Sequence, residues 1–284
     1  MELNYELKTI TPHIVINNSM IRSGNISGII LQNYSVVVDT TSYRKTAELF
    51  RQNFERKFET PIKYLIYTHY HGDHIFGAPV FKDIPIISSI MTLENLNNRD
   101  TLKPLEEWKS SLIVEEPELT EGIEILKPSI CFQKQLILRD DDLSLEIHHS
   151  GGHTSGSSYI YFPAEKALFT GDLIFQDIYP YAGDQTCNPN VWIAQLENFQ
   201  KMDVETIIPG HGSILNGRKA LNKHVAFYKS LKRVVLDAIN DNNAADTINA
   251  PEFFQMEADI WKPVAVEYWY NFFQKAGKNS HLRY

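Results

Sequence analysis

The stretch that most constrains this chain is Thr68–His74 (THYHGDH), which places four side chains able to bind a metal ion within six residues. It follows Ile62–Tyr67 (IKYLIY), an apolar and aromatic run that predicts a buried β-strand. A strand holds its end in place, so the loop that leaves it can direct several side chains to one point. Imidazole nitrogens and a carboxylate suit zinc or another first-row divalent ion. Because four ligands exceed what one tetrahedral ion needs when others come from elsewhere, the sequence predicts a site for two metal ions.

Three glycine-containing segments carry further side chains of this kind: GGHTSGS at 151–157, TGDLIF at 170–175 and PGHG at 209–212. In them His153, Asp172 and His211 each follow or precede an expected strand, as His69 does. Glycine permits close approach of the backbone to a metal and allows positive φ. A single His or Asp at a strand end is usually structural, but four of them together predict a layered sheet with a site along one edge.

The rest of the chain predicts a mixture of short strands and helices. Strands are expected at His13–Ile16, Ile26–Gln32, Ser35–Asp39, Ile84–Ser88, Leu136–Leu138, Leu143–Ile147, Ser158–Phe162, Ala167–Thr170 and Thr206–Ile208. Helices are expected from Thr41 to about Phe58, at Leu93–Trp108, after Asn188-Pro189 and at Ala220–Ile239. Residues 90–125 are expected to form a solvated excursion, with a lid over the site as the alternative. The aromatic segment after Pro251 is expected to pack in the core, with a substrate pocket or a homodimer interface as alternatives.

Composition narrows the class of protein. The 284 residues are 43% hydrophobic and 22% charged, as in a soluble globular protein, and the net charge of −8 disfavours nucleic acid as a partner. The two cysteines form no disulfide framework. The first residues, MELNYELKTI, lack the basic and apolar regions of a secretory signal, and no apolar run is long enough to span a bilayer. We therefore expect a cytoplasmic protein that acts on a small-molecule substrate without membrane association.

These motifs together resemble the metallo-β-lactamase superfamily. The matching pieces are Asp39-Thr40, THYHGDH, GGHTSGS, TGDLIF and PGHG, which occur in the family's order. The resemblance implies an α+β fold, a four-layer αββα sandwich, with extra C-terminal helices. We expect a single domain over residues 1–284, with a core at about 10–215 and a helical extension at about 216–284.

The resemblance also implies the ligand sets. His69, His71 and His153 would hold one ion, Asp73, His74 and His211 the other, and Asp172 would bridge them. The cofactors expected are two divalent ions, taken as Zn²⁺ with iron or manganese as alternatives. A metal-bridging hydroxide would then attack a small ester, thioester or lactone, and Asp73 would orient it.

Differences between this chain and known branches of the superfamily argue against several activities. The β-lactamases of the family carry Cys at the position of Asp172 or lack an acidic bridge there, and flavodiiron proteins carry Glu at the position of His71. Quorum-quenching lactonases place Tyr three residues after the bridging Asp, where this chain has Phe175, so Tyr179 or Tyr181 would have to replace it. GHTSGS and GDLIF are similar to glyoxalase II, but its glutathione-binding basic residues are not found by position.

Three other functions stay open at this stage. One is a persulfide-dioxygenase-like oxidoreductase with a single iron on His69, His153 and Asp172. Another is a phosphodiesterase or nuclease, which the acidic charge disfavours, and the third is a metal-binding protein without catalysis. Among the remaining candidates, Asp39 is expected either to contact the metal loop or to cap the next helix. His148, His149 and Cys187 are expected to serve packing rather than the site.

Overall fold

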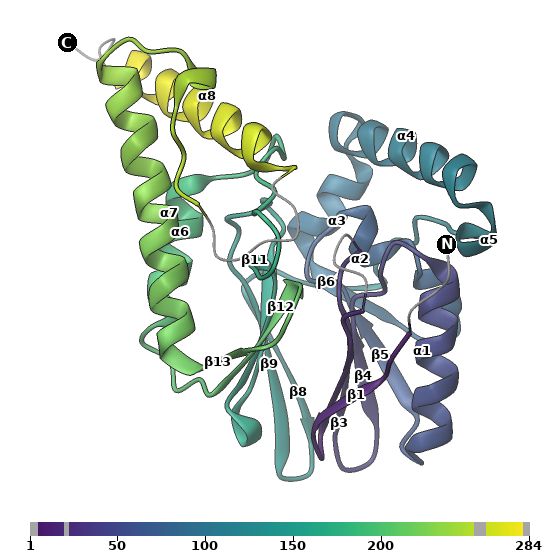
Figure 1. The fold of residues 1–284 in the computed structure, drawn as a ribbon. Coiled ribbons are helices and arrows are strands. Elements are labelled where there is room, and N and C mark those ends of the chain that lie inside the picture. The colour runs from purple at the N-terminus through teal and green to yellow at the C-terminus, as the bar shows by residue number, and fades with distance from the viewer. Residues whose placement is uncertain (1–4, 20–22, 253–259, 281–284) are drawn as a thin grey trace.

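Two β-sheets lie face to face between two layers of helices (Figure 1). The computed structural model describes residues 5–19, 23–252 and 260–280, with only the backbone described for 278–280. Chain order separates the layers, since the first half builds one sheet with its helices and the second half builds the other (Figure 1). This is the αββα sandwich with C-terminal helices that the resemblance implied.

The first sheet has seven strands in the order β1-β2-β3-β4-β5-β6-β7. Pairing is antiparallel from β1 to β4 and parallel from β4 to β7. The strands are β1 (Lys8–Thr11), β2 (Ile14–Asn17), β3 (Ile26–Ile30), β4 (Ser35–Val38), β5 (Ile62–Ile66), β6 (Ile86–Ser89) and β7 (Ile130–Phe132). Helix α1 (Arg44–Lys57) covers the outer face through Ala47, Phe50 and Phe54, which recur at helical spacing and are fully buried.

The second sheet has six strands in the order β13-β12-β11-β10-β9-β8. They are β8 (Gln135–Asp140), β9 (Leu143–His149), β10 (Ser158–Phe162), β11 (Ala167–Phe175), β12 (Thr206–His211) and β13 (Leu215–Asn216). Helices α6 (Pro189–Phe199), α7 (Gly217–Asn240) and α8 (Lys262–Ser280) cover its outer face (Figure 1). No helix in the described part of the chain is long and apolar enough to cross a membrane.

Alternating side chains explain why central strands such as β2 and β4 are buried along their whole length. In β2, Ile14 and Ile16 join the core between the two sheets, whereas Val15 joins the core beneath α1. Strand β4 divides in the same way, with Val36 and Val38 on one side and Val37 on the other. Successive strand residues face opposite sides of a sheet, so a sheet buried on both faces needs apolar residues at every position.

Two expectations about the elements need correction. Strand β11 extends past Thr170 to Phe175 and β12 extends to His211, so Asp172 and His211 lie within strand-paired segments rather than in loops. Irregular register between these parallel strands makes this possible, because the pairing shifts between Gly171 and Phe175. The helix expected at Leu93–Trp108 is two helices, α3 (Ile90–Asn97) and α4 (Arg99–Glu115), because Asn98 ends the first and caps the second.

Short elements complete the chain. They are α2 (Gly72–Ile75), α5 (Pro117–Thr120) and the 3₁₀ turns Ala78–Phe81, Pro163–Glu165 and Ala245–Thr247. In the aromatic C-terminal segment, Trp269 and Phe273 are buried in the core with α6 and α7, as expected. Phe253 and Phe254 lie outside the described residues.

Candidate metal centre

The seven residues implied as ligands meet at one end of the sandwich, in two adjacent groups. The first holds His69, His71, His153 and Asp172, and the second holds Asp73, His74 and His211. Within each group, the possible ligand atoms all lie within 4.8 Å of one another. All seven are buried except His71, which is partly exposed.

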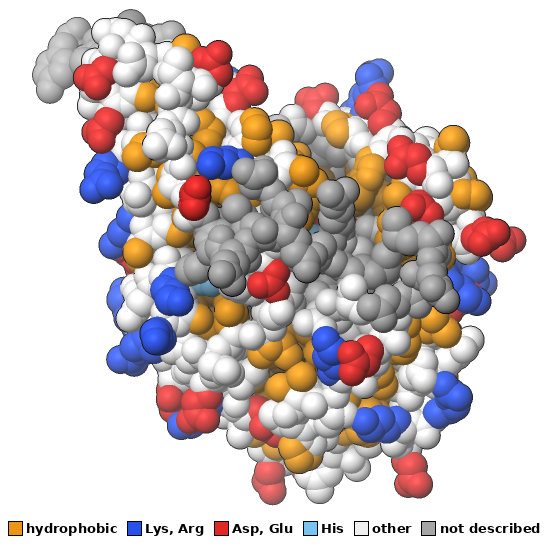
Figure 2. All heavy atoms as spheres, in the orientation of Figure 1, with side chains coloured by type: hydrophobic (Ala, Val, Ile, Leu, Met, Phe, Trp, Pro, Cys, Tyr) orange, Lys and Arg blue, Asp and Glu red, His pale blue; other side chains and the backbone are white. Residues whose placement is uncertain are grey.

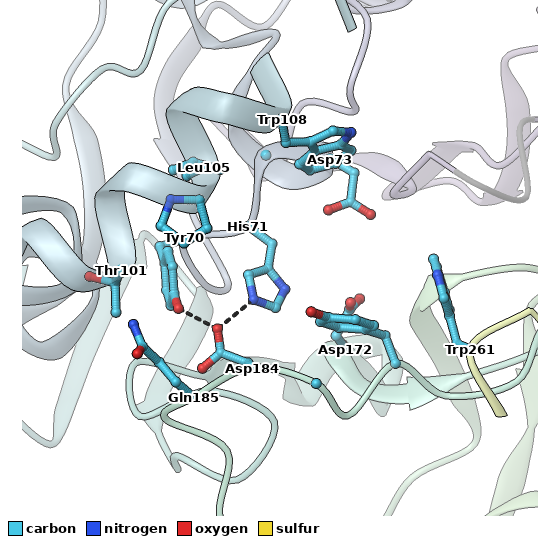
Figure 3. Close-up of a pocket in the computed structure, with 14 residues that line it drawn as sticks. Tyr70, His71, Asp73, Thr101, Leu105, Trp108, Asp172, Asp184, Gln185 and Trp261 are labelled. Carbon is cyan, nitrogen blue, oxygen red and sulfur yellow. Dashed lines mark hydrogen bonds and ion pairs between the residues drawn. The ribbon is translucent and has the colours of Figure 1, made fainter. Parts of the chain in front are cut away.

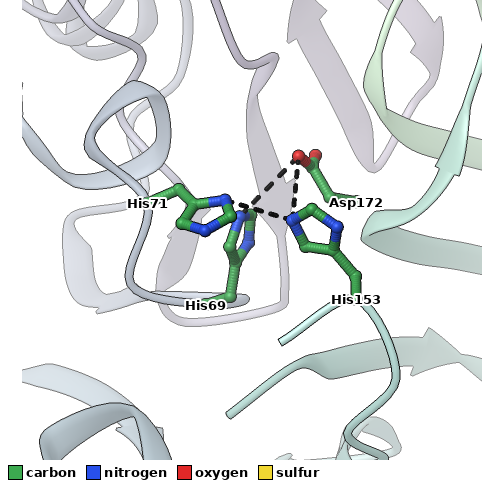
Figure 4. A group of neighbouring side chains, drawn as sticks. All are labelled: His69, His71, His153 and Asp172. Carbon is green, nitrogen blue, oxygen red and sulfur yellow. Dashed lines mark hydrogen bonds and ion pairs between the residues drawn. The ribbon is translucent and has the colours of Figure 1, made fainter. Parts of the chain in front are cut away.

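The first group converges on the carboxylate of Asp172 (Figure 4). Its Oδ2 lies 3.7 Å from Nε2 of His69 and 3.5 Å from Nε2 of His153. Nδ1 of His71 lies 3.1 Å from Nε2 of His153. Three imidazoles from two separate loops therefore point toward one carboxylate, which is an arrangement suited to a first-row divalent ion.

The second group adjoins the same carboxylate from the other side. Nε2 of His211 lies 3.1 Å from Oδ2 of Asp73 and 3.5 Å from Oδ2 of Asp172. Nε2 of His74 lies 3.1 Å from the other oxygen of Asp172, Oδ1. Asp172 therefore stands between the two groups, where one carboxylate can serve two ions.

Several polar atoms in these groups lack an ordinary partner. Nε2 of His69, Nε2 of His74 and Oδ1 of Asp172 are buried and make no well-aligned hydrogen bond within the described residues, although the last two atoms lie 3.1 Å apart. A buried polar atom without a partner is costly and uncommon in native proteins. Here all three atoms point into the same cluster, so the residues present fit a pair of divalent ions.

Asp39 orients the second group. Its carboxylate accepts hydrogen bonds from the backbone N and the Oγ1 of Thr68, at 2.8 and 2.7 Å, and lies 2.8 Å from Nδ1 of His74. A carboxylate on the outer nitrogen of a histidine fixes the ring's tautomer and leaves the inner nitrogen for a metal. Helix α1 begins at Arg44 with Tyr43 as its N-cap, so Asp39 contacts the metal loop and does not cap the helix.

Asp184 orients His71, a role that was not predicted from the sequence. Its Oδ2 lies 2.9 Å from Nε2 of His71 and also accepts a hydrogen bond from the hydroxyl of Tyr70 (Figure 3). Its Oδ1 accepts from the backbone N of Thr186 at 2.7 Å and from that residue's hydroxyl. Asp184 lies in the connection between β11 and α6, far in sequence from the histidines, and no local motif marks it.

Burial and charge shift the pKa values of His69 and His153 in one direction and those of His74 and His211 in the other. Burial holds the pKa of His69 well below its usual range and lowers the pKa of His153 to about 3. Burial also opposes the charged forms of His74 and His211, but the nearby carboxylates outweigh it and raise both pKa values, that of His211 to about 9. A divalent ion would displace the protons of His74 and His211, since ligands bind metal in their deprotonated forms.

Glycine is required where strands β11 and β12 bring Asp172 into the site. A Cβ at Gly210 would overlap the Oδ1 of Asp172, and a Cβ at Gly171, whose φ is +49°, would come within 2.5 Å of the Oγ1 of Thr68. The glycines of the TGD and PGHG motifs therefore make room for the carboxylate between the groups.

A pocket of about 440 Å³ opens onto both groups. His71, Asp73 and Asp172 lie at its base, and Trp108 and Trp261 stand on either side (Figure 3). Its remaining lining residues are Tyr70, Gly72, Thr101, Pro104, Leu105, Tyr181, Gly183, Asp184 and Gln185. Residues of α4 thus form a wall of the site, so the expectation that 90–125 is only a solvated excursion was wrong.

The structure also places the other candidates. Tyr181 lines the pocket, with its ring 5.7 Å from that of His71, whereas Tyr179 is buried in the core behind β11. Cys187 is buried in that core too, as expected. His148 stacks on Tyr159 and His149 contacts a backbone carbonyl, so neither joins the metal groups.

Curated proteins with related sequences include a linear primary-alkylsulfatase from Pseudomonas sp. (strain ATCC 19151), which is 21% identical over 66% of this chain and 41% of its own length. The lactamase-like protein notP of Aspergillus sp. is 24% identical over 72% of this chain and 54% of its length. The acyl-coenzyme A thioesterase MBLAC2 of Gallus gallus is 22% identical over 54% of this chain and 57% of its length. The chain thus spans about half the length of the curated relatives it matches.

Among solved structures, the sec-alkylsulfatase Pisa1 from Pseudomonas sp. aligns with a TM-score of 0.74 at 16% identity, over 95% of this chain and 50% of that one. A metallo-beta-lactamase from Pontibacter korlensis aligns with a TM-score of 0.62 at 18% identity, over 80% of this chain and 99% of that one. The family model of the metallo-beta-lactamase superfamily matches residues 22–211, which include all seven ligand candidates. The chain therefore belongs to the metallo-beta-lactamase superfamily.

Proposed function

We propose that this protein is a dinuclear metal-dependent hydrolase that cleaves uncharged carboxylic esters, thioesters or lactones. The observation that carries the proposal is that two adjacent groups of side chains, each able to hold a metal ion, adjoin one pocket. No lysine or arginine is found among the described residues that line this pocket. An uncharged carbonyl substrate therefore suits the pocket better than a sulfate or phosphate ester, whose charge basic residues commonly bind.

The ligand set supports two ions. His69, His71 and His153 would hold one, Asp73, His74 and His211 the other, with Asp172 between them. When bound, such a pair lowers the pKa of a coordinated water and polarises a carbonyl oxygen. Nitrogen and carboxylate donors suit Zn²⁺ best, with iron or manganese as alternatives.

Asp73 is placed to handle the nucleophile. It lines the pocket, and its pKa lies below the usual range because His74 and His211 outweigh the opposing effect of burial. Its carboxylate is thus ionised at neutral pH and can take a proton from the attacking water. The same oxygen can then pass the proton to the leaving group.

Tyr181 is placed to act on the carbonyl side. Burial raises the pKa of its phenol to about 12, with further contributions from Asp184 and Asp73. The hydroxyl therefore stays protonated and can donate a hydrogen bond to a carbonyl oxygen that gains negative charge. The hydroxyl of Tyr181 would then replace that of the tyrosine that lactonases carry at the position of Phe175.

Hydrolysis of alkyl sulfates is the second candidate. The alignment with the sec-alkylsulfatase covers 95% of this chain, so it includes most of the helical residues after 216. The lack of a basic residue in the described lining argues for carbonyl substrates first. A single-iron oxygenase is less favoured, because the second group of ligands would then have no role.

The first experiment is metal analysis by mass spectrometry on protein purified without added metal. We expect close to two zinc ions per chain, or a mixed pair. A substrate panel would follow, with a neutral aryl ester, a thioester, a lactone, an alkyl sulfate and a phosphodiester. Asp73→Ala is expected to lose turnover even at a zinc concentration high enough to keep two ions bound. One iron per chain with oxygen uptake on a persulfide, or a clear preference for the sulfate, would overturn the proposal.

A further inference from the structure

One face of α4 is turned toward the metal groups. Thr101, Pro104, Leu105 and Trp108 all line the pocket, and their spacing of three, four and seven residues places them on one side of a helix. The ring of Trp108 is anchored against Phe76, with centroids 5.2 Å apart. This side of the pocket is therefore a fixed and mainly apolar wall.

The opposite wall comes from the connection after β11 and from the start of α8. Tyr181 and Trp261 line the pocket with their rings 5.7 Å apart, and the ring of Trp261 also lies 5.7 Å from that of His211. Gly183 lets α8 approach, because a Cβ there would come within 2.5 Å of Val264. The pocket is thus bounded by apolar side chains on both sides, with ionisable groups at the base.

The apolar surface continues outward from the pocket. Trp108 is 37% exposed on the α4 side, and Ile260 and Val264 are 48% and 40% exposed on the α8 side. Figure 2 shows hydrophobic side chains on the α4 side and on the α8 side of the molecule. Exposed apolar side chains beside a pocket with polar groups commonly mark a binding site.

We propose that the cleft between α4 and the start of α8 binds a hydrocarbon chain of the substrate. The chain would lie between Trp108 and Trp261, and its ester, thioester or lactone group would reach the two metal-binding groups. The assignment of a chain attached to a cleavable carbonyl rests on the proposed function. The chain belongs either to the acyl group or to the leaving group, and both have the same chemistry in the cleft.

A chain-length series distinguishes these two cases. Ethyl esters of carboxylic acids from two to ten carbons vary the acyl side, and acetate esters of the matching alcohols vary the leaving group. We expect kcat/KM to rise about fourfold for each added methylene that becomes buried, and then to level off once the cleft is filled. The series that shows this rise identifies the side of the substrate in the cleft. Equal rates along both series would overturn the proposal.

Variants of α4 test the wall itself. Trp108→Ala is expected to lower the ratio of kcat/KM for the decanoyl ester to that for the acetyl ester by at least tenfold. Trp108→Phe keeps the packing on Phe76 and is expected to cause a smaller fall. Val114→Ala is the matched control, because Val114 lies on the same helix, is 80% exposed and does not line the pocket. An unchanged ratio in Trp108→Ala, or an equal fall in Val114→Ala, would contradict the proposal.

Binding can be measured without turnover. Metal-loaded protein titrated with decanoate and with butyrate, followed by calorimetry, is expected to bind decanoate at least a hundredfold more tightly. Trp108→Ala should reduce that preference, and Val114→Ala should not. If decanoate binds in this way but no ester is cleaved, the cleft stands and the proposed function fails. If esters are cleaved without chain-length preference and butyrate binds as well as decanoate, the cleft assignment fails and the function stands.

Discussion

Replacing Asp184 with asparagine would test how His71 is held. The buried carboxylate accepts hydrogen bonds from Tyr70, His71 and Thr186, and these outweigh the effect of burial and keep its pKa low. In Asp184→Asn the shape is kept, but one acceptor oxygen becomes an NH₂ donor. Thr186 still needs an acceptor, so the amide oxygen is expected to stay with Thr186 and the NH₂ group to face Nε2 of His71.

That exchange forces His71 into the wrong tautomer. Opposite an NH₂ group, Nε2 becomes the acceptor and the proton moves to Nδ1, which is the nitrogen that faces His153 and the metal position. A protonated Nδ1 cannot bind a metal ion. Loss of such an outer partner typically costs 10- to 100-fold in metal affinity, which corresponds to about 1.4–2.7 kcal/mol. We expect the binding of the ion held by His69, His71 and His153 to be weakened by this amount.

The assay is competition for Zn²⁺ with a chromophoric chelator, which reports the two dissociation constants separately. Asp83→Asn is the matched control, since Asp83 pairs with Arg51 on the surface, away from the site. Circular dichroism would show that both variants fold. If folded Asp184→Asn binds two zinc ions with the affinity of the unchanged protein, the role given to Asp184 is wrong.

Three further predictions concern the metal groups. Chelation is expected to lower the melting temperature by roughly 5–10 °C relative to protein at a metal concentration about 100 times the Kd, which differential scanning fluorimetry can measure. Gly210→Ala is expected to displace Asp172 and lower the metal content, whereas Gly277→Ala, where a Cβ would meet no atom of the described residues within 4 Å, should leave metal content unchanged. In metal-free protein, Asp172 and Asp73 outweigh burial and raise the pKa of His211 to about 9. The free energy of unfolding that this raised pKa contributes is fully present below about pH 6.5 and is lost as the pH rises through 9. Urea denaturation should therefore show a less stable protein at pH 9 than at pH 6.5.

That the seven ligand candidates come together could be predicted because their sequence signals are local. His69, His71, Asp73 and His74 share one loop, and each remaining ligand has a glycine-containing motif of its own. The apolar strands beside these motifs were predictable for a similar reason, since a doubly buried strand is a continuous apolar run. The family's order of motifs then supplied the sandwich, which strand patterns alone would not have specified.

The walls of the site were not predictable in the same way. Helix α4 carries exposed charged residues on one side and pocket residues on the other, so its sequence is compatible with a solvated excursion as well as with a wall. The role of Asp184 depends on a contact with His71 across 113 residues, and Asp-Gln-Thr is an ordinary turn sequence. The extension of β11 through Asp172 depends on its pairing with β12, which a single strand pattern does not reveal.

The ligand candidates were easier to predict than the pocket walls because the two sets of residues lie in different parts of the fold. All seven ligand candidates lie at one end of the two sheets, where the strands, the glycines, Asp39 and Asp184 leave little freedom to move. The pocket walls come instead from α4, from the connection after β11 and from Trp261, which directly precedes α8, and both helices lie outside the two sheets (Figure 1). A change in those helices can alter the shape of the pocket without moving a ligand. Within one metal-binding frame, the choice of substrate is therefore expected to follow α4 and α8, and the comparison of Trp108→Ala with Asp184→Asn separates the two properties.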